Sequence, residues 1–169
     1  MSDPLILTLE MDGESFGRLD ELRRRFYPPG RNQVPAHVTL FHQLPWDRAR
    51  EIKGLLKLVT TRFAPLIVEA DEPRLTDSGV AVFLRSPQLH ALRGELQAEW
   101  SPWLGLQDQH GWRPHVTIQN KVGAEEARRT MREMAAVSFA RRIRGIGLHL
   151  WRYKGGPWED IQLFRFAKS

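Results

Sequence analysis

The chain is 169 residues long and carries a net charge of +5, from 25 lysines and arginines against 20 aspartates and glutamates. It has no cysteine, which excludes disulfides, thiolate catalysis and cysteine-bound zinc. No apolar stretch approaches the roughly 18 residues that a membrane span needs, and the first residues lack the apolar run of a signal peptide. We therefore expect one cytoplasmic domain without membrane association. The basic balance favours an anionic partner such as nucleic acid or a phosphate ester.

Strand-like and helix-like segments alternate along the chain, and no Ser-rich or Gly-rich linker divides it. Alternating apolar residues identify strands, and apolar residues three or four positions apart identify amphipathic helices. The first half is predicted to contain strands at 5–11, 37–44 and 65–70 and helices at 15–26 and 47–61. The second half is predicted to contain strands at 80–85, 115–119 and 143–153, a helix through Leu89, Leu92, Leu96 and Trp100, and another helix at 124–136. A Gly-Gly-Pro turn at 155–157 leads to a last strand at 160–166.

A short motif repeats together with this order of elements. Residues 37–39 and 115–117 both read His-Val-Thr, and in each copy a proline lies just upstream and an aliphatic residue follows. The two histidines are 78 positions apart, as are the two threonines. We therefore predict one domain over residues 1–169 with an internal duplication, at 5–71 and 80–152, of a β-α-β-α-β unit. Long crossovers together with an antiparallel closing hairpin predict an α+β fold with two lobes of mostly antiparallel sheet.

The spacing within the motif has a structural meaning only on a strand. There, residues two apart share a face, so His37 and Thr39 project together, as do His115 and Thr117. On a helix, residues two apart point in nearly opposite directions. The aliphatic residues between and after them face the core, so the polar pair decorates one face of a buried strand.

Two histidines from symmetric lobes could flank one phosphorus atom. A neutral imidazole would deprotonate the attacking oxygen, and a protonated one would donate to the leaving oxygen in line with it. Histidine suits both roles because its ordinary pKa lies near 6.5. The hydroxyls of Thr39 and Thr117 could donate to non-bridging phosphate oxygens. A single strand histidine is usually structural, but two copies in matched contexts favour function.

The segments His37-Val38-Thr39-Leu40 and Arg113-Pro114-His115-Val116-Thr117-Ile118 resemble the paired signature of the 2H phosphoesterase superfamily, in particular its bacterial 2′-5′ RNA ligase and cyclic phosphodiesterase branch. The resemblance implies a bilobal α+β fold with a pseudo-two-fold axis and a central cleft that holds both motifs. It also implies hydrolysis of 2′,3′-cyclic phosphate or 2′-5′ phosphodiester bonds, with reversible RNA ligation in some members. His37 and His115 would be the acid/base pair, and Thr39 and Thr117 the phosphate-oxygen donors. Where relatives commonly continue the first motif with Phe-Leu-Gly, this chain reads Phe41-His42-Gln43-Leu44, which could reshape the substrate mouth.

Other residues near the motifs are candidates for substrate contact. Arg113 and Lys121 flank the second motif and Arg31 lies near the first, and any of them could steer a phosphate. Among the aromatic residues near the second motif and the closing hairpin, Tyr153 is the best candidate for ligand contact, whereas Trp112, Trp151 and Trp158 are expected to pack in the core or at a lobe edge.

No metal site is expected from the remaining histidines. His42 and His110 each lie five positions from a motif histidine, and an odd separation places rings on opposite strand faces unless a bulge intervenes. His42 is expected to be a partly buried structural residue. We therefore expect no metal and no cofactor.

The leading hypothesis is a monomeric, metal-independent phosphoesterase that acts on RNA or a nucleotide cyclic phosphate. A non-catalytic RNA-binding module that uses the same cleft is the main alternative, motivated by the basic balance and the aromatic residues. Hydrolysis of a small nucleotide cyclic phosphate instead of RNA is a third possibility.

Overall fold

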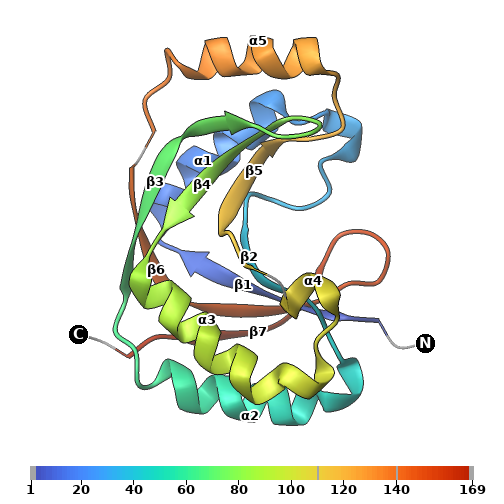
Figure 1. The fold of residues 1–169 in the computed structure, drawn as a ribbon, viewed down its shortest axis with the longest axis vertical. Coiled ribbons are helices and arrows are strands. Elements are labelled where there is room, and N and C mark those ends of the chain that lie inside the picture. The colour runs from blue at the N-terminus through green and yellow to red at the C-terminus, as the bar shows by residue number, and fades with distance from the viewer. Residues whose placement is uncertain (1–2, 110, 140, 168–169) are drawn as a thin grey trace.

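The structure is a computed structural model that describes residues 3–109, 111–139 and 141–167. Its strands and helices alternate as the sequence predicts (Figure 1). The elements in chain order are β1 (Leu5–Met11), α1 (Gly13–Phe26), β2 (Val38–Leu44), α2 (Ala49–Thr60), β3 (Leu66–Leu75), β4 (Val80–Arg85), α3 (Pro87–Trp100), α4 (Leu106–Gln109), β5 (His115–Gln119), α5 (Ala124–Met134), β6 (Arg142–Arg152) and β7 (Glu159–Arg165). Short 3-10 helices cover Pro29–Arg31, Trp46–Arg48 and Ser101–Trp103.

The predicted elements differ most from the observed ones in two places. A short helix, α4, forms where a polar loop was expected, and β3 continues to Leu75 instead of ending near Ala70. The longer β3 forms a hairpin with β4, closed by a hydrogen bond from the Thr76 N–H to the Gly79 carbonyl. A Cβ at Gly79 would overlap the carbonyl of Gln119, so only glycine fits this turn.

The fold class is α+β, as predicted, and the antiparallel pairing extends further than expected. The described strands form one curled sheet in the order β2-β1-β6-β3-β4-β5, and β7 also pairs with β6. Every pairing among these strands is antiparallel. The two lobes share this one sheet because β3 of the first half pairs with β6 of the second.

The strand order has the symmetry that a duplication would produce. If β1, β2 and β3 are exchanged with β4, β5 and β6, the order reads the same from the other end, and only β7 has no counterpart. The duplication itself stays a prediction. Its structural consequence is that the two motif-bearing strands, β2 and β5, occupy equivalent positions at the two edges of the sheet.

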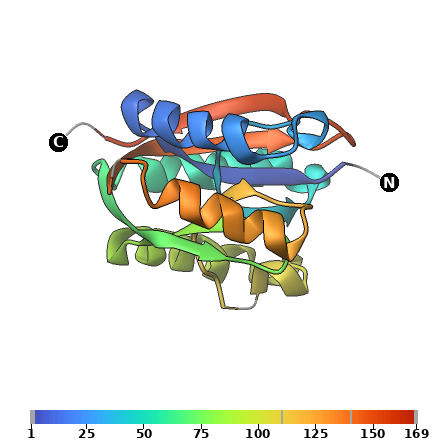
Figure 2. The same cartoon turned by 90° about the horizontal axis from the view of Figure 1, so that it is seen from above.

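Helices of one half pack against strands of the other. Helix α1 contacts β5, while α4, which follows α3, contacts β2. Seen from above, α1 and α3 lie on opposite sides of the molecule, with α5 between them (Figure 2). This exchange draws the two edge strands together, and β2 contacts β5 directly.

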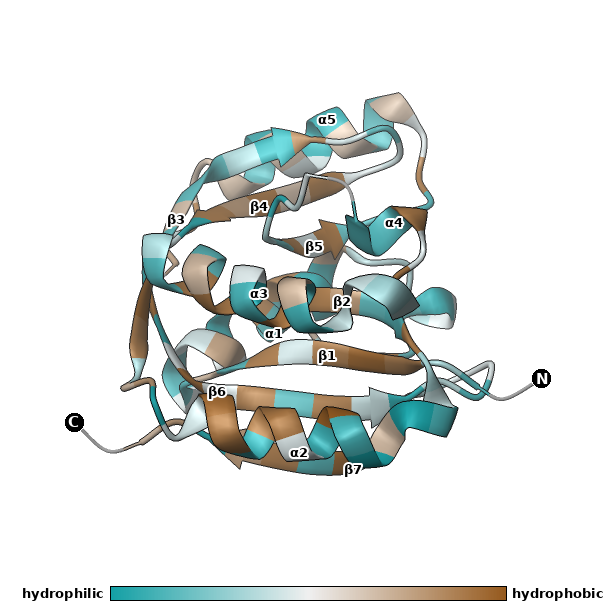
Figure 3. Ribbon diagram, turned by 60° about the horizontal axis from the view of Figure 1, so that its bottom comes forward, coloured by the Kyte–Doolittle hydropathy of each residue, from teal (hydrophilic) through white to brown (hydrophobic). Residues whose placement is uncertain are grey.

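The core lies between the strands and the helices that cover them. Strand β1 lies between β2 and β6 and is buried at nearly every position. Most strands are largely hydrophobic, whereas the helices carry both hydrophobic and hydrophilic residues (Figure 3). Trp100 of α3 is fully buried and packs edge-on against Phe41 of β2, with ring centroids 5.2 Å apart. In the described part of the chain, no helix is long and apolar enough to cross a membrane.

Candidate active site

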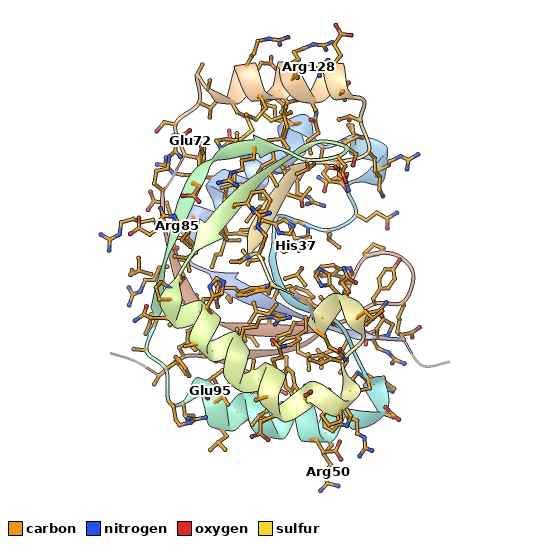
Figure 4. The ribbon with its side chains drawn as sticks, in the orientation of Figure 1. His37, Arg50, Glu72, Arg85, Glu95 and Arg128 are labelled. Atoms are coloured by element: carbon orange, nitrogen blue, oxygen red, sulfur yellow. The ribbon has the colours of Figure 1, made fainter. Side chains whose placement is uncertain are left out.

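The two motif histidines lie at the starts of the two edge strands. His37 immediately precedes β2 and His115 is the first residue of β5. His37 lies between the two halves of the molecule, well away from Arg50 and Arg128 at its opposite ends (Figure 4). Both histidines and both threonines are partly buried, while the residues that alternate with them are fully buried. The structure therefore presents both polar pairs as the sequence predicts.

The two imidazoles are held in the same way. The Nδ1 of His37 is 2.8 Å from the carbonyl oxygen of Pro35, and the Nδ1 of His115 is 2.9 Å from that of Arg113. A carbonyl only accepts, so each Nδ1 carries the proton and donates it. The neutral ring then has an unprotonated Nε2, which is the atom that can exchange a proton with a ligand.

His37 is neutral at physiological pH. Burial, which disfavours the charged form, and the positive charges of Arg23, His115 and His42 together lower the pKa of His37 to about 4. The hydrogen bond to Pro35 opposes these effects without cancelling them. An imidazole that is unprotonated at neutral pH can accept a proton, so His37 is a candidate general base.

Arg23 of α1 links the first half of the chain to the second motif. Its guanidinium is buried, with 4% of the residue exposed, and donates to the carbonyl of Thr117 at 2.9 Å. It also donates to the side chain of Asn32 at 2.9 Å. Burial lowers the pKa of Arg23, though Asp20 and Tyr27 oppose this. Arg23 therefore fixes the Thr117 backbone relative to the loop that precedes His37.

Residues of the second half hold the first motif in return. Arg93 of α3 donates from Nε to the carbonyl of Leu40 at 3.0 Å, and Trp112 donates from its ring N–H to the carbonyl of Thr39 at 2.9 Å. Arg93 also donates to the Asp108 carbonyl at 2.8 Å. Each motif strand is thus anchored by the opposite half of the chain.

A buried carboxylate completes this anchor. Asp108 accepts hydrogen bonds from the backbone N–H groups of His42 and Gln43 and from the ring of His42. Burial alone would raise the pKa of Asp108, but the hydrogen bonds outweigh it and hold the pKa below its usual value. The carboxylate satisfies N–H groups that an edge strand would otherwise leave without a partner.

His42 lies on the same strand face as Thr39. Leu7 pairs with Phe41 and Thr8 with Thr39, so Leu40 is an extra residue, a β-bulge. The bulge returns His42 to the face of Thr39, which is the exception stated for the odd spacing. His42 is partly buried, as expected. His110 lies outside the described residues.

The surroundings of the two histidines differ although their own contacts match. Phe83 pairs with His115 across β4 and β5, and its ring lies 5.4 Å from the imidazole. The guanidinium groups of Arg113 and Arg74 lie 4.7 Å and 5.5 Å from the same Phe83 ring. The His115 side is therefore a flat aromatic platform with two cations.

A cavity adjoins His37 instead. It has a volume of about 620 Å³. Its walls include His37, Glu10, His149, Trp151 and Trp158. The ring of Trp158, from the loop between β6 and β7, meets the His37 ring edge-on at 4.6 Å.

Of the four additional contact residues predicted from sequence, the structure brings one to the site. Arg113 lies beside His115, as described above. Lys121 lies beyond the end of β5 farthest from His115, in a turn where its backbone adopts φ 63. Arg31 is exposed on a 3-10 helix, and Tyr153 is 41% exposed and does not line the cavity.

Several site residues were not predicted from sequence. Trp158 was expected to pack in the core or at a lobe edge, and Arg23, Arg93 and Asp108 were not singled out. Their roles depend on contacts between residues distant in the chain, which no local pattern reveals. Among the described residues, no cluster of three or more histidine, aspartate or glutamate side chains is placed to bind a metal ion.

This curled sheet, with a His-x-Thr motif on each edge strand, is the arrangement expected of the 2H phosphoesterase superfamily. The profile of the 2′-5′ RNA ligase superfamily matches residues 11–157, and the chain belongs to that superfamily. By sequence comparison alone, no curated protein is similar enough to count as a match.

Solved structures with the same fold cover almost the whole chain. The protein TT0787 of Thermus thermophilus aligns with a TM-score of 0.69 at 18% identity, over 98% of this chain and 99% of that one. LigT of E. coli in its apo form aligns with a TM-score of 0.65 at 14% identity, over 99% of each chain. A third structure, described as a phosphoesterase, gives 0.59 at 16% identity, over 98% of this chain and 99% of that one. At these identities the likeness shows a shared fold.

Proposed function

We propose that the protein is a metal-independent phosphodiesterase that cleaves 2′-5′ phosphodiester bonds and hydrolyses 2′,3′-cyclic phosphates in RNA-type substrates. The observation that carries the proposal is the matched pair of imidazoles, each with Nδ1 bonded to a carbonyl and Nε2 available. Crystal structures of E. coli LigT contain 3′-AMP and NADP+, which are both nucleotides. This supports a nucleotide as the ligand.

The first step on a 2′-5′ bond is an internal transesterification. The free 3′-hydroxyl beside the linkage attacks phosphorus, and its proton passes to Nε2 of His37. The bond from phosphorus to the 5′-oxygen breaks, and the Nε2–H of protonated His115 supplies a proton to that oxygen. Thr39 and Thr117 donate to the non-bridging oxygens, which gain charge in the transition state. The products are a 2′,3′-cyclic phosphate and a free 5′-hydroxyl, and reversal of this step is ligation.

The second step consumes one water and exchanges the roles of the histidines. His115, now neutral, accepts a proton from water as it attacks the cyclic phosphate. His37, now protonated, donates to the ribose oxygen that leaves. A phosphate monoester is released and both imidazoles return to their starting states. His37 is assigned as the first base because its pKa of about 4 leaves it unprotonated at neutral pH.

The test is cleavage of a 2′-5′-linked diadenosine monophosphate in excess chelator, followed by chromatography of the products. Wild type is expected to turn over, and His37→Ala or His115→Ala should each lose at least about 100-fold in kcat. Arg50→Ala, an exposed change far from His37, serves as control. Full activity of either histidine variant, or loss of activity with chelator and recovery with a divalent metal, would contradict the proposal.

A non-catalytic RNA-binding role is the second candidate, and the observation that favours it is the Phe83 platform with Arg74 and Arg113. It predicts salt-dependent RNA binding that survives loss of both histidines, with no turnover. Comparing adenosine 2′,3′-cyclic phosphate with an oligonucleotide that ends in a 2′,3′-cyclic phosphate separates a small-nucleotide hydrolase from an RNA enzyme.

A further inference from the structure

The cavity beside His37 adjoins the proposed catalytic site at that residue. His37 itself forms part of its wall. Its volume of about 620 Å³ lies within the range of roughly 300–1,000 Å³ typical of small-molecule sites. A ligand whose reacting atom lies at Nε2 of His37 can therefore extend into this space.

Two tryptophans form a corner in the cavity. The rings of Trp151 and Trp158 have centroids 6.2 Å apart and planes inclined at 56°. This geometry leaves no parallel slot between them, so a planar ligand would stack on one ring and meet the other at its edge. Two contacts hold Trp151 in place. Its ring N–H donates to the Thr8 hydroxyl at 2.9 Å, and its ring stacks on that of His149 with centroids 3.8 Å apart.

The charges around the cavity suit an uncharged occupant. Burial alone would lower the pKa of His149, but Glu10 and Asp160 outweigh it and raise the pKa above its ordinary value. The Nε2 of His149 lies 2.7 Å from Asp160, and its Nδ1 lies 3.5 Å from Glu10. Arg165 and the carboxylate of Glu10 both line the cavity, in contrast to the two arginines on the His115 side.

We propose that this cavity is a nucleobase subsite, in which the base of the nucleotide adjoining His37 stacks on Trp158 and Trp151. Base–aromatic stacking needs a flat ring at the wall of a partly desolvated space, and both tryptophans provide one. Glu10 lines the cavity, and carboxylate oxygens only accept hydrogen bonds. A base that carries an exocyclic amino group, such as adenine, is therefore favoured.

The subsite fixes the direction of the substrate and rests on the proposed function. The nucleoside in the cavity brings its own free ribose hydroxyl to His37, so this nucleoside is the 2′-linked one. The departing 5′-linked nucleoside then lies on the other side of phosphorus, over Phe83 and its two arginines. The two sides of the cleft thus bind chemically different parts of the substrate.

The experiment uses three 2′-5′-linked dinucleotides: the intact diadenosine compound, one with 1-deoxyribose in place of the 2′-linked adenosine, and one with 1-deoxyribose in place of the 5′-linked adenosine. For Trp158→Ala, KM is expected to rise about 10- to 100-fold with the two substrates that keep the 2′-linked base, the range that base–aromatic stacking supplies. KM should not change when that base is absent. Trp158→Phe should recover much of the loss, and Tyr153→Ala, an exposed aromatic near the same loop, should match wild type.

Three results would overturn the subsite. An equal rise in KM on all three substrates would show that Trp158 only supports His37. A rise in KM that depends on the 5′-linked base would reverse the direction of the substrate. An unchanged KM on every substrate would remove the subsite. Calorimetric titration of the same variants with adenosine 2′-phosphate and with its base-free analogue measures binding at the subsite without turnover. If wild type cleaves none of the dinucleotides, the proposed function fails, and the titration still decides whether the base is bound.

Discussion

At the scale of single residues, the two motif histidines have the same hydrogen bond and different surroundings. Each ring donates from Nδ1 to a carbonyl two positions earlier. This contact is local to the motif and therefore follows from the sequence around each histidine. The difference between the rings arises from distant residues, because Trp158 contacts His37 and Phe83 contacts His115.

The low pKa of His37 predicts how activity depends on pH. His37 must be unprotonated to act as the first base, and its pKa is lowered to about 4 by burial and by the nearby charges of Arg23, His115 and His42. Lowering the pH from 7 should therefore leave kcat/KM for 2′-5′ cleavage unaffected by His37 until pH approaches 4, where activity should fall. The check is kcat/KM measured in steps from pH 7 to pH 3.5, with circular dichroism at each step to confirm that the protein is folded. If kcat/KM instead fell around pH 6.5, the ordinary pKa of histidine, and the fall were assigned to His37, the prediction would be contradicted.

The sequence predicted the positions of the motif residues on their strands better than it predicted their neighbours in space. His37, Thr39, His115 and Thr117 follow from a period of two on predicted strands, and the structure places them as expected. Trp158 could not be singled out, because its contact with His37 joins residues 121 positions apart. Tyr153 was the preferred aromatic candidate in the sequence but lies outside the cavity.

At the scale of elements, a helix from each half of the chain holds the motif strand of the other half by a hydrogen bond. Arg23 on α1 holds the Thr117 carbonyl of β5, and Arg93 on α3 holds the Leu40 carbonyl of β2. The predicted helices and strands did not reveal which helix would cover which edge strand. One local signal did exist for the bulge in β2, since Leu40 and Phe41 are adjacent apolar residues that interrupt the alternation.

Arg23 should act as a positioning residue. Arg23→Lys keeps the charge but cannot donate to both Thr117 and Asn32 with the geometry of a guanidinium. We expect kcat to fall about 10- to 100-fold, because a displacement of about 1 Å in the phosphate-binding strand is enough for such a loss, while KM changes little. Arg24→Lys, on the exposed neighbouring position, is the matched control. Unchanged kcat in Arg23→Lys would show that the link has no effect on catalysis.

Asp108 should contribute mainly to stability. Replacing its carboxylate in Asp108→Asn weakens charged hydrogen bonds to His42 and Gln43, and such bonds each contribute about 1.5–3 kcal/mol. A loss of roughly 2 kcal/mol in the free energy of unfolding is expected, measured by urea denaturation. Asp47→Asn, at an exposed position, should leave the unfolding midpoint unchanged. Equal midpoints for the two variants would contradict the anchoring role of Asp108.

At the scale of the whole molecule, the symmetric strand order explains why two motifs far apart in the sequence can form one site. The order β2-β1-β6-β3-β4-β5 places the motif strands at the two edges, and curling brings these edges into contact. The repeated spacing of 78 residues predicted equivalent positions for the motifs. It could not predict that the halves would share one sheet, because that depends on the pairing of β3 with β6.

The central claim is that both imidazoles act on one phosphorus from opposite sides. A crystal structure of the protein with adenosine and vanadate, which forms a five-coordinate mimic of the transition state, tests it most directly. We predict a single vanadate whose two apical oxygens lie about 2.7–3.2 Å from Nε2 of His37 and of His115, with the hydroxyls of Thr39 and Thr117 on its equatorial oxygens. A vanadate that contacts only one of the two histidines, or that binds outside the cleft between β2 and β5, would contradict the account.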